Sequence, residues 1–98
     1  MKKIALITGI AGQDGTYLAE HLQPLPYKIV GTVRRMTPEI RHLIDSIDSD
    51  IELLETPELS ASITQEIIRQ YQPDELYNLA GQSSVGRSWN ETTETLIL

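Results

Sequence analysis

A glycine-rich turn near the N-terminus constrains the fold of this chain more than any other feature. An apolar run typical of a β-strand occupies residues 4–7, and Gly9, Gly12 and Gly15 follow at steps of three. An amphipathic helical pattern begins directly afterwards at Tyr17. In a strand–turn–helix unit of this kind, backbone N–H groups and the positive end of the helix face a pyrophosphate. The turn therefore predicts a dinucleotide site.

The spacing of this turn separates it from two other phosphate-binding motifs. It reads G-x-x-G-x-x-G, whereas the common dinucleotide fingerprint is G-x-G-x-x-G, and a P-loop would need a following Lys-Ser or Lys-Thr. A tight surface turn also needs glycine, but the position between strand and helix favours the dinucleotide site. Asp14 lies beside the expected pyrophosphate, and we expect its carboxylate to point away and stabilise the helix N-terminus.

Strands and helices are predicted to alternate along the whole chain. Strands are predicted at Lys3–Thr8, Tyr27–Val33, 51–54 and 75–80. Helices are predicted at 12–23, from Pro38 after an N-cap at Thr37, after a capping box at 62–65, and from about Asn90 to Leu98. This alternation predicts an α/β fold with a doubly wound parallel sheet of the Rossmann type and strand order 3-2-1-4. The last predicted strand would form an uncovered sheet edge.

Composition excludes several classes of protein. The chain has 98 residues, no cysteine, and a net charge of −6, which argues against a disulfide scaffold, thiolate metal sites and nucleic-acid binding. His21 and His42 lack a paired spacing, so no metal site is expected. No apolar run is long enough to span a membrane, and no signal peptide is visible. We expect a cytoplasmic protein without membrane contact, and the N-terminal piece of a longer one.

Two arginines stand where the cofactor preference of such a fold is decided. NAD-binding domains place an acidic residue about 20 positions after the glycines, where it holds the ribose hydroxyls. This chain has Arg34 and Arg35 there, and no Asp or Glu between Lys28 and Thr37. Two guanidinium groups suit a 2′-phosphate, so the pair predicts NADP, although a solvated basic pair at a strand end is the simpler alternative.

The segment after the fourth predicted strand is the other candidate binding loop. Small residues within 78–84 let a ribose and pyrophosphate lie against the backbone, and Gln82, Ser83 and Ser84 offer hydrogen bonds. An ordinary polar loop is the alternative. No Tyr-x-x-x-Lys pair and no nucleophile beside a base occur in the chain, so no catalytic residue is predicted.

Three stretches of the chain resemble one enzyme family. Residues 5–20, with the sequence Gly-Gln-Asp-Gly-Thr-Tyr-Leu-Ala-Glu at 12–20, resemble the opening of GDP-mannose 4,6-dehydratases, which are extended short-chain dehydrogenases/reductases. Residues 33–35 are similar to the Val-Arg-Arg of that family, and residues 72–85 to its fourth strand and loop. The similarity spans this chain but only about the first third of a family member, so residues 1–98 are expected to be a partial NAD(P)-binding domain.

The resemblance implies an activity and a set of binding residues. It implies NADP-dependent conversion of GDP-mannose to GDP-4-dehydro-6-deoxy-mannose, a GDP-fucose precursor, by a homo-oligomer in which the arginines also reach a neighbouring subunit. The family's catalytic residues would lie beyond Leu98. Together with the glycine motif, the implied cofactor-binding residues are Gly9, Ile10, Ala11, Gly12, Gln13, Asp14, Gly15, Arg34, Arg35, Leu79, Ala80, Gly81, Gln82 and Ser83.

Departures from the family pattern leave alternatives open. The family's Gly-Asp-Leu after the third strand is replaced by a segment in which either Pro57 or Glu58 matches the acid that touches adenine. Pro26 replaces a family glycine before the second strand. A related nucleotide-sugar reductase or epimerase is one alternative function, and a non-catalytic dinucleotide-binding fragment is another.

Overall fold

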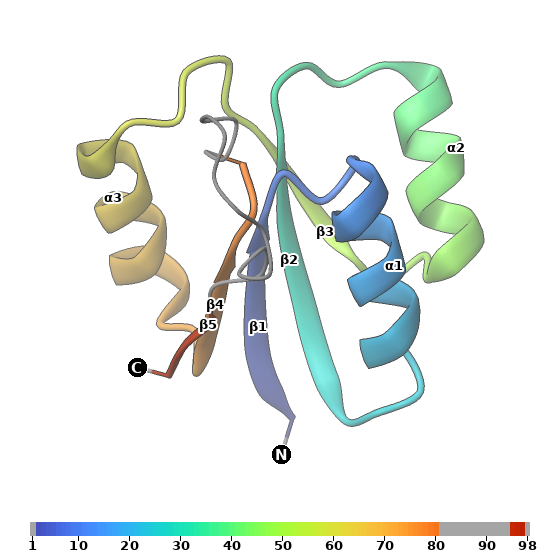
Figure 1. Ribbon diagram of the computed structural model, residues 1–98, viewed down its shortest axis with the longest axis horizontal. Helices are drawn as coiled ribbons and strands as arrows, with labels where there is room; N and C mark the ends of the chain where they lie inside the picture. The colour runs from blue at the N-terminus through green and yellow to red at the C-terminus, as the bar shows by residue number, and fades with distance from the viewer. Residues whose placement is uncertain (1, 81–94, 98) are drawn as a thin grey trace.

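Parallel strands form the centre of the fold in residues 2–80 and 95–97, the residues that the computed structural model describes. Four of these strands run parallel, and a fifth pairs antiparallel at one edge. The strands are β1 Lys3–Thr8, β2 Tyr27–Val33, β3 Glu52–Glu55, β4 Glu75–Asn78 and β5 Thr95–Ile97. Their order, β3-β2-β1-β4-β5, confirms the predicted α/β class and the 3-2-1-4 arrangement of the parallel strands (Figure 1).

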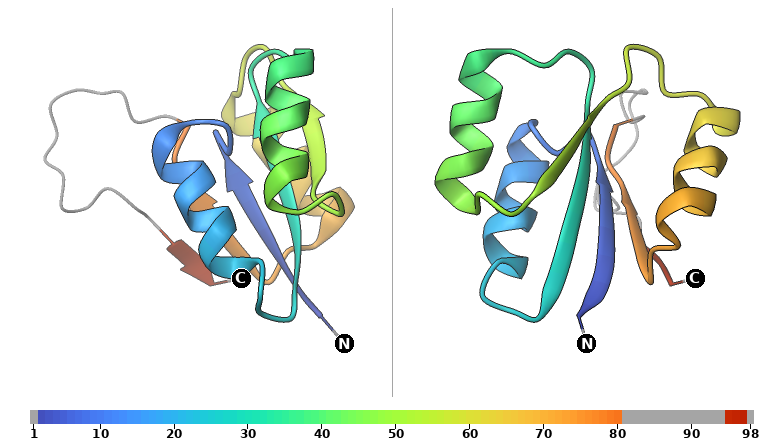
Figure 2. Two further views of the ribbon diagram at one scale, coloured as in Figure 1. Left: turned by 90° about the vertical axis from the view of Figure 1, so that its right-hand side faces the viewer. Right: turned by 180° about the vertical axis from the view of Figure 1, so that it is seen from behind.

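Helices cover both faces of this sheet. The described helices are α1 Gln13–Leu22, α2 Pro38–Ile47 and α3 Ala61–Tyr71. α1 and α2 lie together on one face and α3 lies on the other, as Figures 1 and 2 show. Because side chains alternate along a strand, Leu6 of β1 packs in the cluster of Ile67 from α3, and Ile7 in that of Ala19 from α1. Both faces of β1 are therefore buried, as its continuous apolar run predicts.

The third helix begins two residues earlier than the sequence predicts. Ser60 is the N-cap of α3, and its Oγ accepts a hydrogen bond from the Ile63 N–H at 3.2 Å. Ser62, the predicted start of a capping box, lies inside the first turn, so that prediction is wrong. Either serine could cap the helix locally. The preceding Leu59 packs against the same apolar cluster as Ile67, which favours the earlier start.

The C-terminal segment is the largest departure from the sequence-based expectation. The sequence predicts a helix from about Asn90 to Leu98, but Thr95–Ile97 form β5, which pairs antiparallel with β4 in the register Glu75↔Ile97. Residues 90–94 and 98 lie outside the described residues. An open strand edge presents unpaired N–H and C=O groups, and a short segment rich in β-formers can satisfy them. The expectation of an uncovered β4 edge is therefore wrong as well.

Two strand ends differ from the prediction by one or two residues. β4 ends at Asn78 and not at Ala80, because the Leu79 and Ala80 N–H groups donate to the side chain of Thr8. β3 runs one residue later than predicted, and its last residue, Glu55, pairs with Val33 of β2. Both changes lie at the carboxyl edge of the sheet.

Candidate functional site

A groove of about 700 Å³ opens at the carboxyl ends of β1 to β4. Ligands of doubly wound sheets bind at this edge, where the strand order reverses. The predicted site residues that line the groove are Gly9, Ala11, Gly12, Arg34, Arg35, Leu79 and Ala80. The predicted residues Ile10, Gln13, Asp14 and Gly15 belong to the same turn and helix start, but they are not part of the lining. The predicted residues Gly81, Gln82 and Ser83 lie outside the described residues.

The turn after β1 is held in a conformation that only glycine adopts easily. Gly9 has a φ of +72°, and a Cβ added there would lie 3.0 Å from the Ala80 Cα. Thr32 of β2 holds this turn through two hydrogen bonds. Its Oγ1 accepts from the Gly9 N–H, and its carbonyl oxygen accepts from the Ile10 N–H, each at 3.0 Å. Hydrogen bonds from β2 therefore hold the turn against the sheet.

The other two motif glycines have different surroundings. A Cβ on Gly15 would lie 2.5 Å from the Gly9 carbonyl oxygen, so Gly15 lets α1 pack against the turn. Among the described residues, a Cβ on Gly12 would meet only that same oxygen, at an ordinary 3.5 Å. Gly12 is exposed and lines the groove, so the space that its missing side chain leaves is open to a ligand.

The N-terminus of α1 differs from the starts of α2 and α3. Gly12 is its N-cap and offers no side-chain hydrogen bond, whereas Thr37 Oγ1 caps α2 by accepting from the Ile40 N–H at 3.1 Å. The N–H groups of a first helical turn have no partner within the helix, and together with the dipole they attract anions. Asp14 is exposed in this first turn and does not line the groove.

A buried threonine joins the glycine turn to the loop after β4. Thr8 is 1% exposed, and its Oγ1 donates to Asn78 Oδ1 at 2.9 Å. The same oxygen accepts from the N–H groups of Leu79 and Ala80 at 3.0 and 3.1 Å. Thr8 and Thr32 are not among the predicted site residues. The signal in the sequence was a threonine at the end of a buried strand, next to the first glycine.

Ile10 fills the space beneath the turn. Its side chain is fully buried, and a Cβ on Gly31 of β2 would lie 2.6 Å from its methyl carbons. Ile10 therefore anchors the turn through its packing and does not face the groove. Gly31 is a further residue that the sequence-based prediction missed.

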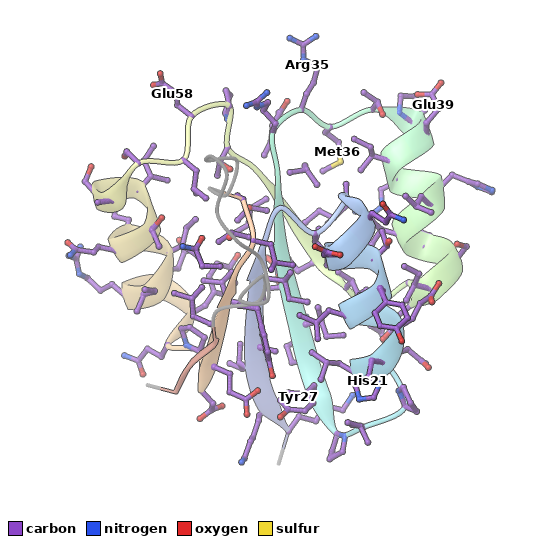
Figure 3. All side chains as sticks on the ribbon, viewed as in Figure 1. His21, Tyr27, Arg35, Met36, Glu39 and Glu58 are labelled. Carbon is purple, nitrogen blue, oxygen red and sulfur yellow. The ribbon has the colours of Figure 1, made fainter. Side chains whose placement is uncertain are left out.

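Arg34 and Arg35, hereafter the arginine pair, follow β2 and line the groove beside the N-cap of α2. Both are exposed, and Figure 3 shows Arg35 projecting away from the end of the sheet. Within residues 2–80 and 95–97, the salt bridges join Lys28 to Glu52 and Arg41 to Asp45, and none involves the arginine pair. Exposed guanidinium groups that line a groove suit an anionic ligand.

The loop after β3 closes the far side of the groove. Pro57 and Glu58, the two alternatives for the adenine contact, both line it and are both exposed. The side chain of Glu58 points away from the sheet in Figure 3. Among the described residues, no group of three or more His, Asp or Glu side chains could hold a metal ion. No helix in that part of the chain is long and apolar enough to cross a membrane.

Known proteins match the chain over almost its whole length. Residues 6–97 match the family described as GDP-mannose 4,6 dehydratase. The chain belongs to this family. It is 42% identical to the GDP-mannose 4,6-dehydratase of Vibrio cholerae, 43% to GDP-mannose 4,6 dehydratase 2 of Arabidopsis thaliana and 38% to the human enzyme. These alignments cover 90–96% of this chain and 26–27% of the relatives, so the chain spans about a quarter of their length.

Solved structures share the fold. A Burkholderia cenocepacia protein named as an epimerase aligns with a TM-score of 0.66 and 31% identity, covering 83% of this chain and 26% of that chain. A mycobacterial quinone oxidoreductase aligns over 85% of this chain and 26% of its own with a TM-score of 0.58. At 20% identity it shows the fold alone. Membership of the family indicates a Rossmann-type domain that binds a nucleotide cofactor, and both neighbours share this fold.

The residues of the groove fit such a cofactor. The open space at Gly12 and the uncapped start of α1 suit a pyrophosphate, which needs close approach to the backbone. The arginine pair lies on the β2 side of the same groove. The fit therefore depends on turn geometry and on charge together.

Proposed function

We propose that this chain is the cofactor-binding part of an NADP-dependent GDP-mannose 4,6-dehydratase. The observation that carries the proposal is a single groove that both the glycine turn and the arginine pair line, in a chain of this family. The bound nicotinamide would supply the redox chemistry, while these residues bind and orient it. The substrate would be GDP-mannose and the product GDP-4-dehydro-6-deoxy-mannose.

The choice of NADP over NAD rests on the end of β2. A carboxylate at that point would hold the two ribose hydroxyls of NAD, whereas the arginine pair offers charge-assisted hydrogen bonds to a 2′-phosphate. The acidic residue at the end of the neighbouring strand, Glu55, accepts a hydrogen bond from the Met36 backbone. The groove therefore supports the phosphorylated cofactor.

Calorimetric titration of the chain with NADP and with NAD tests the cofactor. We expect NADP to bind more tightly, and equal affinities would contradict the proposal. Reading the DNA beyond codon 98 tests the activity. A Tyr-x-x-x-Lys downstream would support the dehydratase, and its absence from all frames would favour a binding fragment without catalysis.

A related nucleotide-sugar epimerase is the second candidate. It is favoured by the 31% identity to the Burkholderia cenocepacia protein named as an epimerase. The Gly-Gln-Asp-Gly run at 12–15 favours the dehydratase. A Thr-x-Glu or Ser-x-Glu near the downstream Tyr-x-x-x-Lys would decide for dehydration. The homo-oligomer and the cytoplasmic location stay predictions.

A further inference from the structure

The loop that carries the arginine pair is closed by a carboxylate from the neighbouring strand. Val33 and Glu55 form the last register pair of β2 and β3. Directly after the arginine pair, the Met36 N–H donates to Glu55 Oε2 at 3.1 Å. The Glu55 side chain thus reaches from β3 to the loop between β2 and α2 and holds the backbone of that loop at Met36.

This hydrogen bond fixes the middle of a short connection whose two ends are already fixed. One end is Val33, whose carbonyl oxygen accepts from the Thr56 N–H at 2.8 Å, and the other is Thr37, the N-cap of α2. Met36 is partly buried against the apolar cluster beneath α1 and α2, on the opposite side from the exposed Arg35 (Figure 3). With the Met36 amide held, both guanidinium groups extend from a backbone of defined direction.

The charge of Glu55 acts against the binding of an anion beside the arginine pair, whereas its hydrogen bond favours that binding. The carboxylate lowers the positive potential that the arginine pair creates in the groove. Removing that charge alone should strengthen the binding of a phosphate, whereas removing the hydrogen-bond acceptor should loosen the loop and weaken that binding. Glutamine keeps an acceptor oxygen without the charge, and alanine keeps neither, so the two substitutions separate the effects.

We propose that Glu55 is a positioning residue for the arginine pair, and that it thereby sets the preference of the groove for a 2′-phosphorylated adenosine ligand. The inference rests on the proposed NADP site and adds to it a residue that does not line the groove.

Affinities for adenosine 2′,5′-bisphosphate and for 5′-AMP, measured by calorimetry on the whole chain, test the proposal. These probes differ only in the 2′-phosphate. Glu55→Ala should lower the affinity for the bisphosphate roughly fivefold, the equivalent of one ordinary hydrogen bond, and leave the affinity for 5′-AMP unchanged. Glu55→Gln should bind the bisphosphate at least as tightly as the parent chain. Glu39→Ala, which removes an exposed carboxylate from the first turn of α2, is the matched control and should not weaken it.

Hydrogen exchange at the Met36 amide separates this proposal from the proposed function. Glu55→Ala should speed that exchange, and Glu55→Gln should restore protection. Unchanged exchange in Glu55→Ala, or tighter bisphosphate binding in both variants, would overturn the positioning role. Accelerated exchange in a chain that binds both probes equally would instead show that the arginine pair does not select the phosphate. That result would refute both the cofactor assignment and the specificity role of Glu55, while leaving the hydrogen bond itself established.

Discussion

At the scale of single residues, the three glycines of the turn show how one motif contains different physical requirements. Gly9 is needed for a positive φ and Gly15 for close packing, whereas only Gly12 leaves space on the ligand side. The sequence predicts all three because their spacing is regular. It cannot tell them apart, since the atoms that each would meet come from the folded turn.

Replacing Gly12 should abolish binding without unfolding the chain. Its φ of −75° and ψ of 174° suit a β-branched residue, and an added Cβ would have no close contact with the part of the chain that the structure describes. Gly12→Val therefore fills the groove where a pyrophosphate approaches the backbone. Calorimetry with NADP measures the loss, and circular dichroism checks the fold. A folded variant with normal affinity would place the phosphate elsewhere.

Gly15 provides the contrast within the same motif. A Cβ there would lie 2.5 Å from the Gly9 carbonyl oxygen and 2.6 Å from that of Ile10, both in the backbone. Gly15→Ala should lower the free energy of unfolding by about 1–3 kcal/mol, the usual cost of overpacking. Urea denaturation measures the change. Stability equal to that of the parent chain would show that the turn can move away from α1.

The arginine pair gives a prediction about charge. Arg35→Asp should lose one charge-assisted contact and weaken NADP binding by roughly 1.5–3 kcal/mol, whereas NAD binding should not weaken, because a carboxylate there can hold the ribose hydroxyls. Arg69→Asp on α3, which makes the same charge change outside the groove, is the control. Equal losses of NADP affinity in the two variants would show that the effect comes from net charge and not from a contact of Arg35. No loss in Arg35→Asp would remove this residue from the site.

At the scale of elements, a buried carboxylate links β2 and β4 at the end of the sheet opposite the groove. Glu75 is 9% exposed and accepts hydrogen bonds from the Tyr27 and Tyr77 hydroxyls at 2.8 Å each. Burial, and then the hydrogen bond to Glu75, raises the pKa of Tyr77 above its ordinary value of 10.0. The hydrogen bond to Glu75 is the main cause that raises the pKa of Tyr27.

These shifts predict how stability depends on alkaline pH. A raised tyrosine pKa means that the folded state keeps its proton after the unfolded state has lost it. The contribution of the Tyr77 hydroxyl to the free energy of unfolding is therefore complete below pH 10, and it is lost as the pH rises toward the pKa of the folded state. Tyr77→Phe should cost about 0.5–1.5 kcal/mol at pH 8. The gap between variant and parent should narrow above pH 10 in urea titrations, and a gap independent of pH would contradict the shift.

The elements also show where prediction from sequence succeeds. β1 and β2 have their predicted bounds, and α2 begins at its predicted N-cap, because each has strong local signals of apolar run or cap. The sequence does not predict β5, because the secondary structure of Thr95–Ile97 depends on pairing with the edge of β4, about 20 positions away in sequence. Thr8 was missed for the same reason, since its partners lie 70 to 72 positions further along.

At the scale of the whole molecule, the described residues form a binding groove, and the sequence contains no Tyr-x-x-x-Lys pair. Its radius of gyration is 12.6 Å, close to the value of about 13 Å for a complete domain of 100 residues. The groove is built from segments within residues 9–80. The lining residues suit a nucleotide cofactor, whereas dehydration of a hexose requires a base and a proton relay at the sugar.

The chain of 98 residues should accordingly bind NADP but form no product. It contains four tyrosines, and none has a lysine four positions later. Incubation of the purified chain with NADP and GDP-mannose should yield no 4-keto sugar above a control without protein, while calorimetry on the same sample reports binding. Gly12→Val, which should do neither, shows that the binding signal comes from the groove. Product formed by the parent chain and not by Gly12→Val would mean that the groove residues and their neighbours supply the acid and base themselves.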